Sequence, residues 1–311
     1  MSSLVAIVGP TAIGKSSLAL ELSQAFGGEI INADSRQVYR YMDIGTAKPT
    51  PDEQVLVPHH LIDVVDPDQN FSLALYQNEA REAMKLIQQK GKPAFLVGGS
   101  GLYVWSVLEG WRIPPVPPDP SLRQELEARA ESEGAEVLYE ELKQLDPVAA
   151  QRIDPRNVRR VIRAIEVCRQ GKPFSQLQRK EPFVNSLIIG LTTGRTSLYQ
   201  RIDARVDSMM EKGLLAEVEG LVSQGYGFDL PSMSGLGYKQ IGLFIQGKMD
   251  LPAAVQQIKT DTHRFARHQY NWFRPQDERI HWFEPRKGGI RAISSLVKQF
   301  LSNRLSKNID N

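Results

Sequence analysis

Hydrophobic positions in the first hundred residues alternate between strand-like runs and helix-like spacing. Residues 4–8 and 94–97 are short apolar runs with the length of buried strands, and residues 29–33 are predicted to form another buried strand. Between them, Leu18 and Leu22 begin a helical pattern, and a longer one covers residues 73–89. Strands that alternate with helices are typical of a parallel sheet covered on both faces, so the pattern predicts an α/β core.

The pattern changes at residues 111–120, where five of ten residues are proline. Such a run excludes helix and central strand and predicts a stiff linker. Helical spacing follows it, strand character returns at residues 187–191, and a helix carrying Ile202 and Val206 comes next. We therefore expect an α/β core built from residues 1–112 and 186–311, interrupted by a helical insertion at 113–185.

Composition narrows the class of protein. Of 311 residues, 41% are hydrophobic and 24% are charged, as in ordinary globular proteins, which excludes bulk disorder. A single cysteine, Cys168, excludes an intrachain disulfide and a cysteine-based zinc ribbon, so we expect a cytoplasmic protein. No apolar run reaches the roughly 18 residues of a membrane span, and the first residues lack the basic region of a signal peptide.

Residues 9–16, Gly-Pro-Thr-Ala-Ile-Gly-Lys-Ser, fit the phosphate-loop pattern between a predicted strand and a predicted helix. Loop amides and the helix N-terminus would bind a di- or triphosphate, Lys15 would reach its terminal phosphates, and Ser16 would bind Mg²⁺. A glycine-rich turn that binds nothing is the alternative, and the strand–loop–helix context disfavours it. The phosphate site is assigned to Gly9, Pro10, Thr11, Ala12, Ile13, Gly14, Lys15 and Ser16.

Asp34 follows the second predicted strand, beside the expected phosphate loop. It could cap a helix, it could be the metal-coordinating acid that follows a hydrophobic strand in ATPases, or it could act on an acceptor substrate as a general base or as the hydrogen-bond acceptor that orients it. No Asn-Lys-x-Asp motif occurs, which excludes the usual GTPases. Spacing alone leaves these roles of Asp34 open.

The net charge of +2 argues against nucleic acid, but it averages over segments of opposite sign. Residues 121–146 hold three basic and eight acidic residues. Residues 151–181 hold nine basic and three acidic residues, and residues 259–291 hold eight basic and four acidic residues. On a helix, Arg159, Arg160 and Arg163 share a face, which is either a solvated surface or a surface for a polyanion. Aromatic residues in the last segment could stack on bases or pack in the core: Tyr270, Trp272, Phe273 and Trp282.

Taken together, these motifs resemble those of the bacterial tRNA dimethylallyltransferases, also called tRNA isopentenyltransferases. The likeness starts in the phosphate loop and in Asp-Ser-Arg-Gln-Val-Tyr at residues 34–39. It continues in order along nearly the whole chain, through residues 42–49, 58–63, 97–103, 146–153, 163–167, 237–240 and 272–274. The resemblance implies a phosphate-loop NTPase-like α/β sheet with an inserted all-helical tRNA-binding domain.

The resemblance also implies an activity. A dimethylallyl group would pass from dimethylallyl diphosphate to the exocyclic amine of the adenine 3′-adjacent to the anticodon, in tRNAs that read codons starting with U. Asp34 would take the proton of that amine, while Thr11, Lys15 and Mg²⁺ on Ser16 would stabilise the diphosphate that leaves. The implied partners are dimethylallyl diphosphate and the anticodon stem–loop of tRNA, and we expect a monomer without membrane contact.

Residues expected to contact tRNA carry over from the same resemblance: Asp34, Ser35, Arg36, Gln37, Ser100, Arg123, Arg159, Arg160, Val161, Ile162, Arg163, Gly235, Gly237, Tyr238 and Lys239. One departure is His268, which stands where relatives carry a fixed cation, so a phosphate contact is less expected there. Two other functions share part of the pattern: a phosphate-loop small-molecule or nucleoside kinase, and a non-catalytic RNA-binding protein. The kinase leaves residues 34–49 unexplained, and an intact Lys15, Ser16 and Asp34 argue against the second. The adjacent His59 and His60 do not suggest a metal site.

Overall fold

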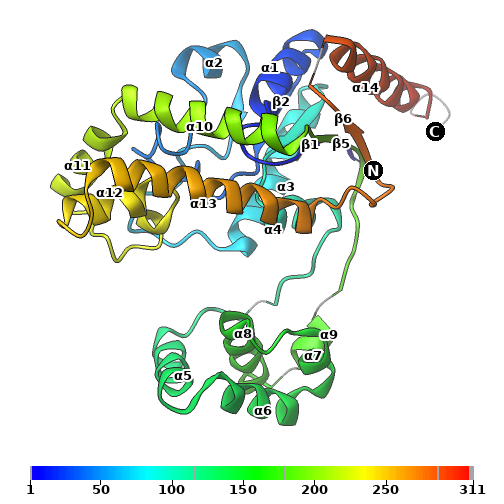
Figure 1. The fold of residues 1–311 in the computed structure, drawn as a ribbon. Coiled ribbons are helices and arrows are strands. Elements are labelled where there is room, and N and C mark those ends of the chain that lie inside the picture. The colour runs from blue at the N-terminus through cyan, green and yellow to red at the C-terminus, as the bar shows by residue number, and fades with distance from the viewer. Residues whose placement is uncertain (1, 115, 172, 178, 286, 308–311) are drawn as a thin grey trace. The chain divides into compact units, whose positions relative to one another are not determined.

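A computed structural model describes residues 2–114, 116–171, 173–177, 179–285 and 287–307. The chain divides into two compact units, one of Met1–Leu108 with Phe183–Asn311 and one of Glu109–Pro182 (Figure 1). Residue 115 of the predicted linker and the basic residues 172 and 286 lie outside the described residues.

The larger unit contains a six-stranded sheet in which every neighbouring pair is parallel. The strand order is β3-β2-β4-β1-β5-β6, so the first strand lies near the middle, with Leu4 between Ala94 and Ser186. The predicted α/β core with a parallel sheet is confirmed. The strands are β1 (Ser2–Val8), β2 (Glu29–Asn32), β3 (His59–His60), β4 (Ala94–Val97), β5 (Val184–Leu191) and β6 (Ile280–Phe283).

Both faces of the central strand β1 are covered. Val5 and Ile7 belong to a core cluster that includes Leu22, Ile202 and Val297 from three helices. Residues 4, 6 and 8 point to the opposite face and are also fully buried. Burial on both sides explains why this strand is a continuous apolar run rather than an alternating one. The helices next to the sheet include α1 (Lys15–Phe26), α3 (Leu73–Gln89), α4 (Gly101–Leu108), α10 (Arg195–Glu211) and α14 (Lys287–Lys307).

A further group of helices in this unit follows β2 or β5 in the chain. The longest, α13, runs for 22 residues and begins after Asp250, whose side chain accepts a hydrogen bond from the backbone N–H of Ala253. Among the residues that the structure describes, no helix is long and apolar enough to cross a bilayer. These elements are α2 (Pro51–Leu56), α11 (Leu214–Ser223), the 3₁₀ helix η1 (Ser232–Ser234), α12 (Tyr238–Ile245) and α13 (Leu251–Trp272).

The smaller unit is all helical around its own core, which includes Leu126, Leu142, Ile162 and Ile165. It spans 109–182 where the sequence pattern indicated 113–185, because its two chain ends pair with each other. The N–H of Arg112 donates to the Arg179 carbonyl, and the N–H of Glu181 donates to that of Gly110. The helices are α5 (Pro120–Glu133), α6 (Ala135–Leu145), α7 (Pro147–Arg152), α8 (Val158–Arg169) and α9 (Phe174–Leu177).

Candidate functional site

The phosphate loop joins β1 to α1, as the pattern predicted. Gly9 has a φ of +138°, and a Cβ at this position would lie 2.5 Å from the carbonyl oxygen of Leu191, so only glycine fits. Gly14, with a φ of +102°, ends the loop, and α1 begins at Lys15. The Lys15 ammonium folds back over the loop and donates to the Pro10 carbonyl at 2.8 Å.

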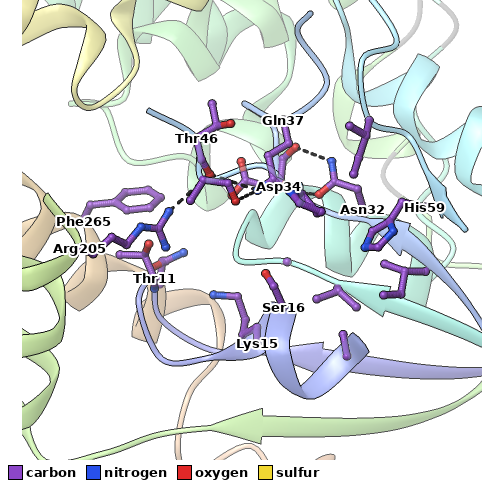
Figure 2. A pocket seen from close by; sticks show the side chains of 18 residues that line it. Thr11, Lys15, Ser16, Asn32, Asp34, Gln37, Thr46, His59, Arg205 and Phe265 are labelled. Atoms are coloured by element: carbon purple, nitrogen blue, oxygen red, sulfur yellow. Dashed lines mark hydrogen bonds between the residues drawn. The ribbon is translucent and has the colours of Figure 1, made fainter. Parts of the chain in front are cut away.

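A cavity opens at this loop (Figure 2). It lies where β2 and β4 end, and side chains from α10 and α13 complete it. This is the edge of a parallel α/β sheet at which ligands are bound. The polar lining residues are Thr11, Lys15, Ser16, Asn32, Asp34, Gln37, Thr46, His59, Arg205 and Gln269; the others are Ala19, Ile30, Ala47, Pro49, Ile62, Val97, Gly98 and Phe265.

Three charged side chains meet in the cavity, and two of them are cations. Burial lowers the pKa of Lys15 to about 8, with the carboxylate of Asp34 opposing that shift and Arg205 adding to it. Burial also lowers the pKa of Arg205, again against the attraction of Asp34. Two desolvated cations facing one carboxylate leave an excess of positive charge that a bound anion would neutralise.

Asp34 is held by a turn and not by a helix. Its N–H donates to Asn32 Oδ1, and its own Oδ1 accepts from the N–H of Arg36 at 2.9 Å. The next helix, α2, begins only at Pro51, so the helix-capping interpretation is wrong. The carboxylate instead lines the cavity, where it can act on a bound substrate.

The residues after Asp34 tie neighbouring loops together. The backbone N–H of Ser35 donates to Ser100 Oγ, and Gln37 Nε2 donates to the Thr46 carbonyl. The guanidinium of Arg36 donates to the carbonyls of Pro231 and Ser232 and to Ser234 Oγ. The resemblance predicts tRNA contacts for Ser35, Arg36, Gln37 and Ser100. The structure shows that each of them also makes a hydrogen bond that connects one loop of the site to another segment of the chain.

Residues 235–239, predicted as a tRNA contact, are mostly inaccessible. Gly235, Gly237 and Tyr238 are buried. The Tyr238 hydroxyl donates to Glu217, whose carboxylate also accepts the N–H groups of residues 43–45. Burial and the nearby Glu217 raise the pKa of Tyr238. Tyr238 therefore supports the loop that carries Thr46, and Lys239 is the exposed side chain of this segment.

In the helical unit, the predicted tRNA contacts divide into exposed and structural residues. Val161 and Ile162 are 1% and 3% exposed and pack in the core of this unit, so their side chains do not face an external partner, and tRNA contact at these two positions stays a prediction. The guanidinium of Arg123 donates to Glu166 at 2.9 Å, and Arg163 also pairs with this buried carboxylate. Arg159 and Arg160 are exposed, as a contact with an external partner requires.

The packing of aromatic and histidine side chains bears on several secondary hypotheses. Phe273 is 1% exposed, so it cannot stack on a base, and the Tyr270 hydroxyl lies 2.9 Å from Thr192 Oγ1. Trp272 is 40% exposed, and its ring packs beside Gly101. Among the described residues, no group of three or more histidine, cysteine or acidic side chains could hold a metal ion. His60 pairs with Glu29 instead.

Sequence reasoning missed cavity residues that come from other elements. Arg205 and Gln269 lie on α10 and α13, far along the chain from the phosphate loop. Each sits next to buried apolar positions, such as Ile202 and Ala266, and nothing in a single sequence separates it from a solvated polar residue. Asn32 could have been identified from the sequence, because a polar side chain inside a buried strand needs a hydrogen-bond partner. The remaining missed polar residues are Thr46 and His59.

Comparison with known proteins decides the family. Residues 37–276 match the family model described as IPP transferase, and residues 2–58 match the one described as isopentenyl transferase. The chain belongs to the IPP transferase family. The resemblance read from the motifs is confirmed, and this family fits the site better than a kinase does.

Curated relatives of this IPP transferase family member cover most of its length. It is 55% identical over 279 residues to the tRNA dimethylallyltransferase of Herpetosiphon aurantiacus, covering 89% of each chain. Identity to the Thermomicrobium roseum protein of the same name is 50%, covering 92% of this chain and 87% of that one.

Solved structures of IPP transferases share the fold. A tRNA isopentenylpyrophosphate transferase from Bacillus halodurans has 39% identity and a TM-score of 0.74, covering 100% of both chains. A eukaryotic dimethylallyltransferase acting on tRNA has a TM-score of 0.82 at 26% identity, covering 97% of this chain and 80% of that one.

Proposed function

We propose that this protein transfers a dimethylallyl group from dimethylallyl diphosphate to the exocyclic amine of an adenine in tRNA. The adenine lies 3′-adjacent to the anticodon in tRNAs that read codons starting with U. The observation that carries the proposal is the meeting of Lys15, Arg205 and Asp34 in one cavity beside the phosphate loop. A kinase needs the phosphate loop but leaves the motif at residues 34–49 unexplained, and several of these residues line the same cavity.

The cation-rich end of the cavity would hold the diphosphate. When the allylic carbon–oxygen bond breaks, negative charge grows on the diphosphate and positive charge on the five-carbon group. Lys15, Arg205 and the loop amides stabilise the growing negative charge, and the Thr11 hydroxyl adds a donor. Because these cations are already desolvated, they need little rearrangement as the charge develops.

Ser16 fits a magnesium ion. Its hydroxyl lines the cavity at the start of α1, and oxygen is the donor that Mg²⁺ prefers. Magnesium sites of this kind use one or two protein oxygens together with substrate phosphates, so a larger acidic cluster is not needed. When bound, the ion would withdraw charge from the diphosphate and so make it a better leaving group.

Asp34 would act on the acceptor. The adenine amine attacks the allylic carbon, the new nitrogen–carbon bond forms, diphosphate departs, and Asp34 accepts the proton released from nitrogen. An adenine stacked in the anticodon loop cannot reach such a cavity, so it must be extruded from the stack. Arg159, Arg160 and Lys239 would contribute to tRNA binding through phosphate contacts.

Incubation of the protein with labelled dimethylallyl diphosphate, Mg²⁺ and unmodified tRNA tests the proposal. Label should appear in tRNA, and Asp34→Ala should lower the single-turnover rate by about 10²–10⁴-fold while tRNA binding persists. Near-normal turnover by Asp34→Ala would exclude it as the base. Transfer of γ-phosphate from ATP to a small acceptor would support the kinase instead. Failure of both reactions with intact tRNA binding would support a non-catalytic protein.

A further inference from the structure

Gln269 links two loops of the cavity from a helix at the other end of the chain. Its Oε1 accepts the backbone N–H of Thr11 at 2.8 Å, and its Nε2 donates to the Gly99 carbonyl at 3.0 Å. The residue is 4% exposed. The amide group thus bonds the phosphate loop through its oxygen and the loop after β4 through its nitrogen.

The contact with Gly99 continues to Asp34. The neighbouring Ser100 accepts the N–H of Ser35 at 2.9 Å, and its own N–H donates to the Ala33 carbonyl at 3.2 Å. Hydrogen bonds therefore run from Thr11 through Gln269 and the 99–100 backbone to the residues on either side of Asp34. The loops that follow β1, β2 and β4 are joined in one network.

The position of Gln269 is fixed by hydrogen bonding and close packing at the end of α13. The indole N–H of Trp105 donates to the Trp272 carbonyl at 2.9 Å, which fastens the last turn of α13 to α4. The Trp272 ring leaves no space for a side chain at Gly101, where a Cβ would lie 2.2 Å from it. A Cβ at Gly99 would likewise lie 2.2 Å from Gln269 Nε2. The backbone must come this close for the glutamine to reach both loops.

We propose that Gln269 is a positioning residue that sets the distance between the phosphate loop and Asp34. This inference rests on the proposed function, in which the diphosphate lies at one loop and the amine at the other. Bond exchange needs the two reacting atoms at about 3–3.5 Å, and a 1 Å displacement can cost about 10²-fold in rate. Each loop can still bind its own ligand without the link, so the loss should appear in the rate and not in binding.

A second consequence concerns the phosphate loop. The Thr11 N–H is committed to Gln269, so the diphosphate must be bound by other loop amides and by the side chains of Lys15 and Arg205. The same bond orients the Thr11 backbone from which its hydroxyl reaches into the cavity. Loss of Gln269 would free this amide for exchange with water, while Lys15, Arg205 and the other loop amides would still bind the diphosphate.

The experiment compares Gln269→Met, which keeps the side-chain length but removes both hydrogen bonds, with Gln256→Met on the exposed face of the same helix. We expect Gln269→Met to lower the single-turnover rate by about 10–100-fold. The KM for dimethylallyl diphosphate and the Kd for tRNA should stay within about threefold, because each loop keeps its own ligands. Gln256→Met should match the wild type in all three.

Gln269→Glu supplies a pH signature that a loss of stability would not produce. A carboxylate can accept from Thr11 but cannot donate to Gly99, whereas a protonated carboxyl group can do both. The rate of this variant relative to wild type should therefore rise as the pH falls toward about 5, near the range in which a buried carboxyl group takes up its proton. The ratio for Gln269→Met should not change with pH.

Exchange of the Thr11 amide hydrogen with deuterium gives a readout that does not depend on activity. It should be faster in Gln269→Met than in wild type, and unchanged in Gln256→Met. Wild-type protein that transfers no label would overturn the proposed function. Wild-type transfer together with a Gln269→Met variant that matches Gln256→Met in rate and in Thr11 exchange would overturn the positioning role alone, as would equal losses in rate and in both binding constants.

Discussion

The two units differ in which charged groups they bury. In the cavity of the larger unit, burial lowers the pKa values of Lys15 and Arg205, and only the carboxylate of Asp34 opposes it. In the helical unit, burial raises the pKa of Glu166, but the hydrogen bonds from Arg123, the N–H of Asp119 and Arg163 outweigh it, and the net pKa is lowered. In the cavity the desolvated groups are two cations that share one carboxylate, whereas in the helical unit the desolvated group is one carboxylate paired with two partly exposed arginines.

This difference separates a binding site from a structural ion pair. A folded protein tolerates incompletely neutralised charge where a ligand supplies the balance. A neutralised carboxylate with two guanidinium partners stabilises the packing around it, and removing one partner is costly. Arginines in a structural ion pair and arginines exposed for binding cannot be told apart in the sequence. Sequence alone therefore groups Arg123 and Arg163 with the exposed arginines.

Among the variants that test this comparison, the largest effect is expected at Lys15. Lys15→Met should lower the rate of dimethylallyl transfer by about 10²–10³-fold, because the variant lacks a preorganised donor to the leaving diphosphate. The free energy of unfolding should not fall, since the charge removed is a desolvated one. Lys85→Met, on the exposed face of α3, is the matched control and should leave both quantities unchanged. A lower free energy of unfolding for Lys15→Met would contradict the assignment of Lys15 to a binding site rather than to a structural ion pair.

Glu166 should behave in the opposite way. Glu166→Gln leaves Arg123 and Arg163 without a carboxylate and should lower the free energy of unfolding by about 3 kcal/mol in denaturant titrations. Because the folded-state pKa of Glu166 is lowered, its stabilisation is present above about pH 4.5 and disappears as the pH falls through the folded value. The difference in unfolding free energy between Glu166→Gln and the wild type should therefore disappear at acidic pH. Glu140→Gln, an exposed pair with Lys143, should show no comparable gap.

The pH dependence of stability at Lys15 has the same sign as at Glu166 but falls in an alkaline range, because folding lowers the pKa of both groups. The pKa of Lys15 is 10.5 in the unfolded chain and about 8 in the fold, so between these values the unfolded state binds more protons and stability rises with pH. The difference in unfolding free energy between wild type and Lys15→Met should shrink over that range, by no more than about 3 kcal/mol. Urea titrations at several pH values measure it, and a difference that does not change from pH 8 to 10.5 would contradict the assigned cause.

The smallest effect is expected at Arg159 and Arg160. Replacing both with alanine should weaken tRNA binding about 10-fold and lower the dependence of log affinity on log salt by about 2, one for each phosphate that is no longer neutralised. Stability should be unchanged, because both side chains are exposed. Arg123→Ala is the contrasting variant, and its effect should appear first as a lower free energy of unfolding. If the double variant kept the wild-type salt dependence, α8 would not be a tRNA surface.

Much of the site follows from local sequence. The phosphate loop occurs where a strand meets a helix, and its glycines are explained by backbone conformations that only glycine adopts easily. Asp34 could be placed because the ends of parallel strands meet at one edge of the sheet. The helical insertion was visible because proline-rich residues separate two different hydrophobic periods.

What tertiary structure decided is which polar residues face the cavity and which hold it together. Arg205 and Gln269 reach it from α10 and α13, and Tyr238 turns inward to Glu217, although its motif suggested a surface contact. The direction of a polar side chain on a helix depends on what packs against that face, and this is set by contacts between residues far apart in the chain. The sequence by itself therefore determined the fold class, the phosphate loop and the acidic residue beside it. Only the folded chain could determine the second cation, the link between the loops, and the division of the arginines into structural and exposed.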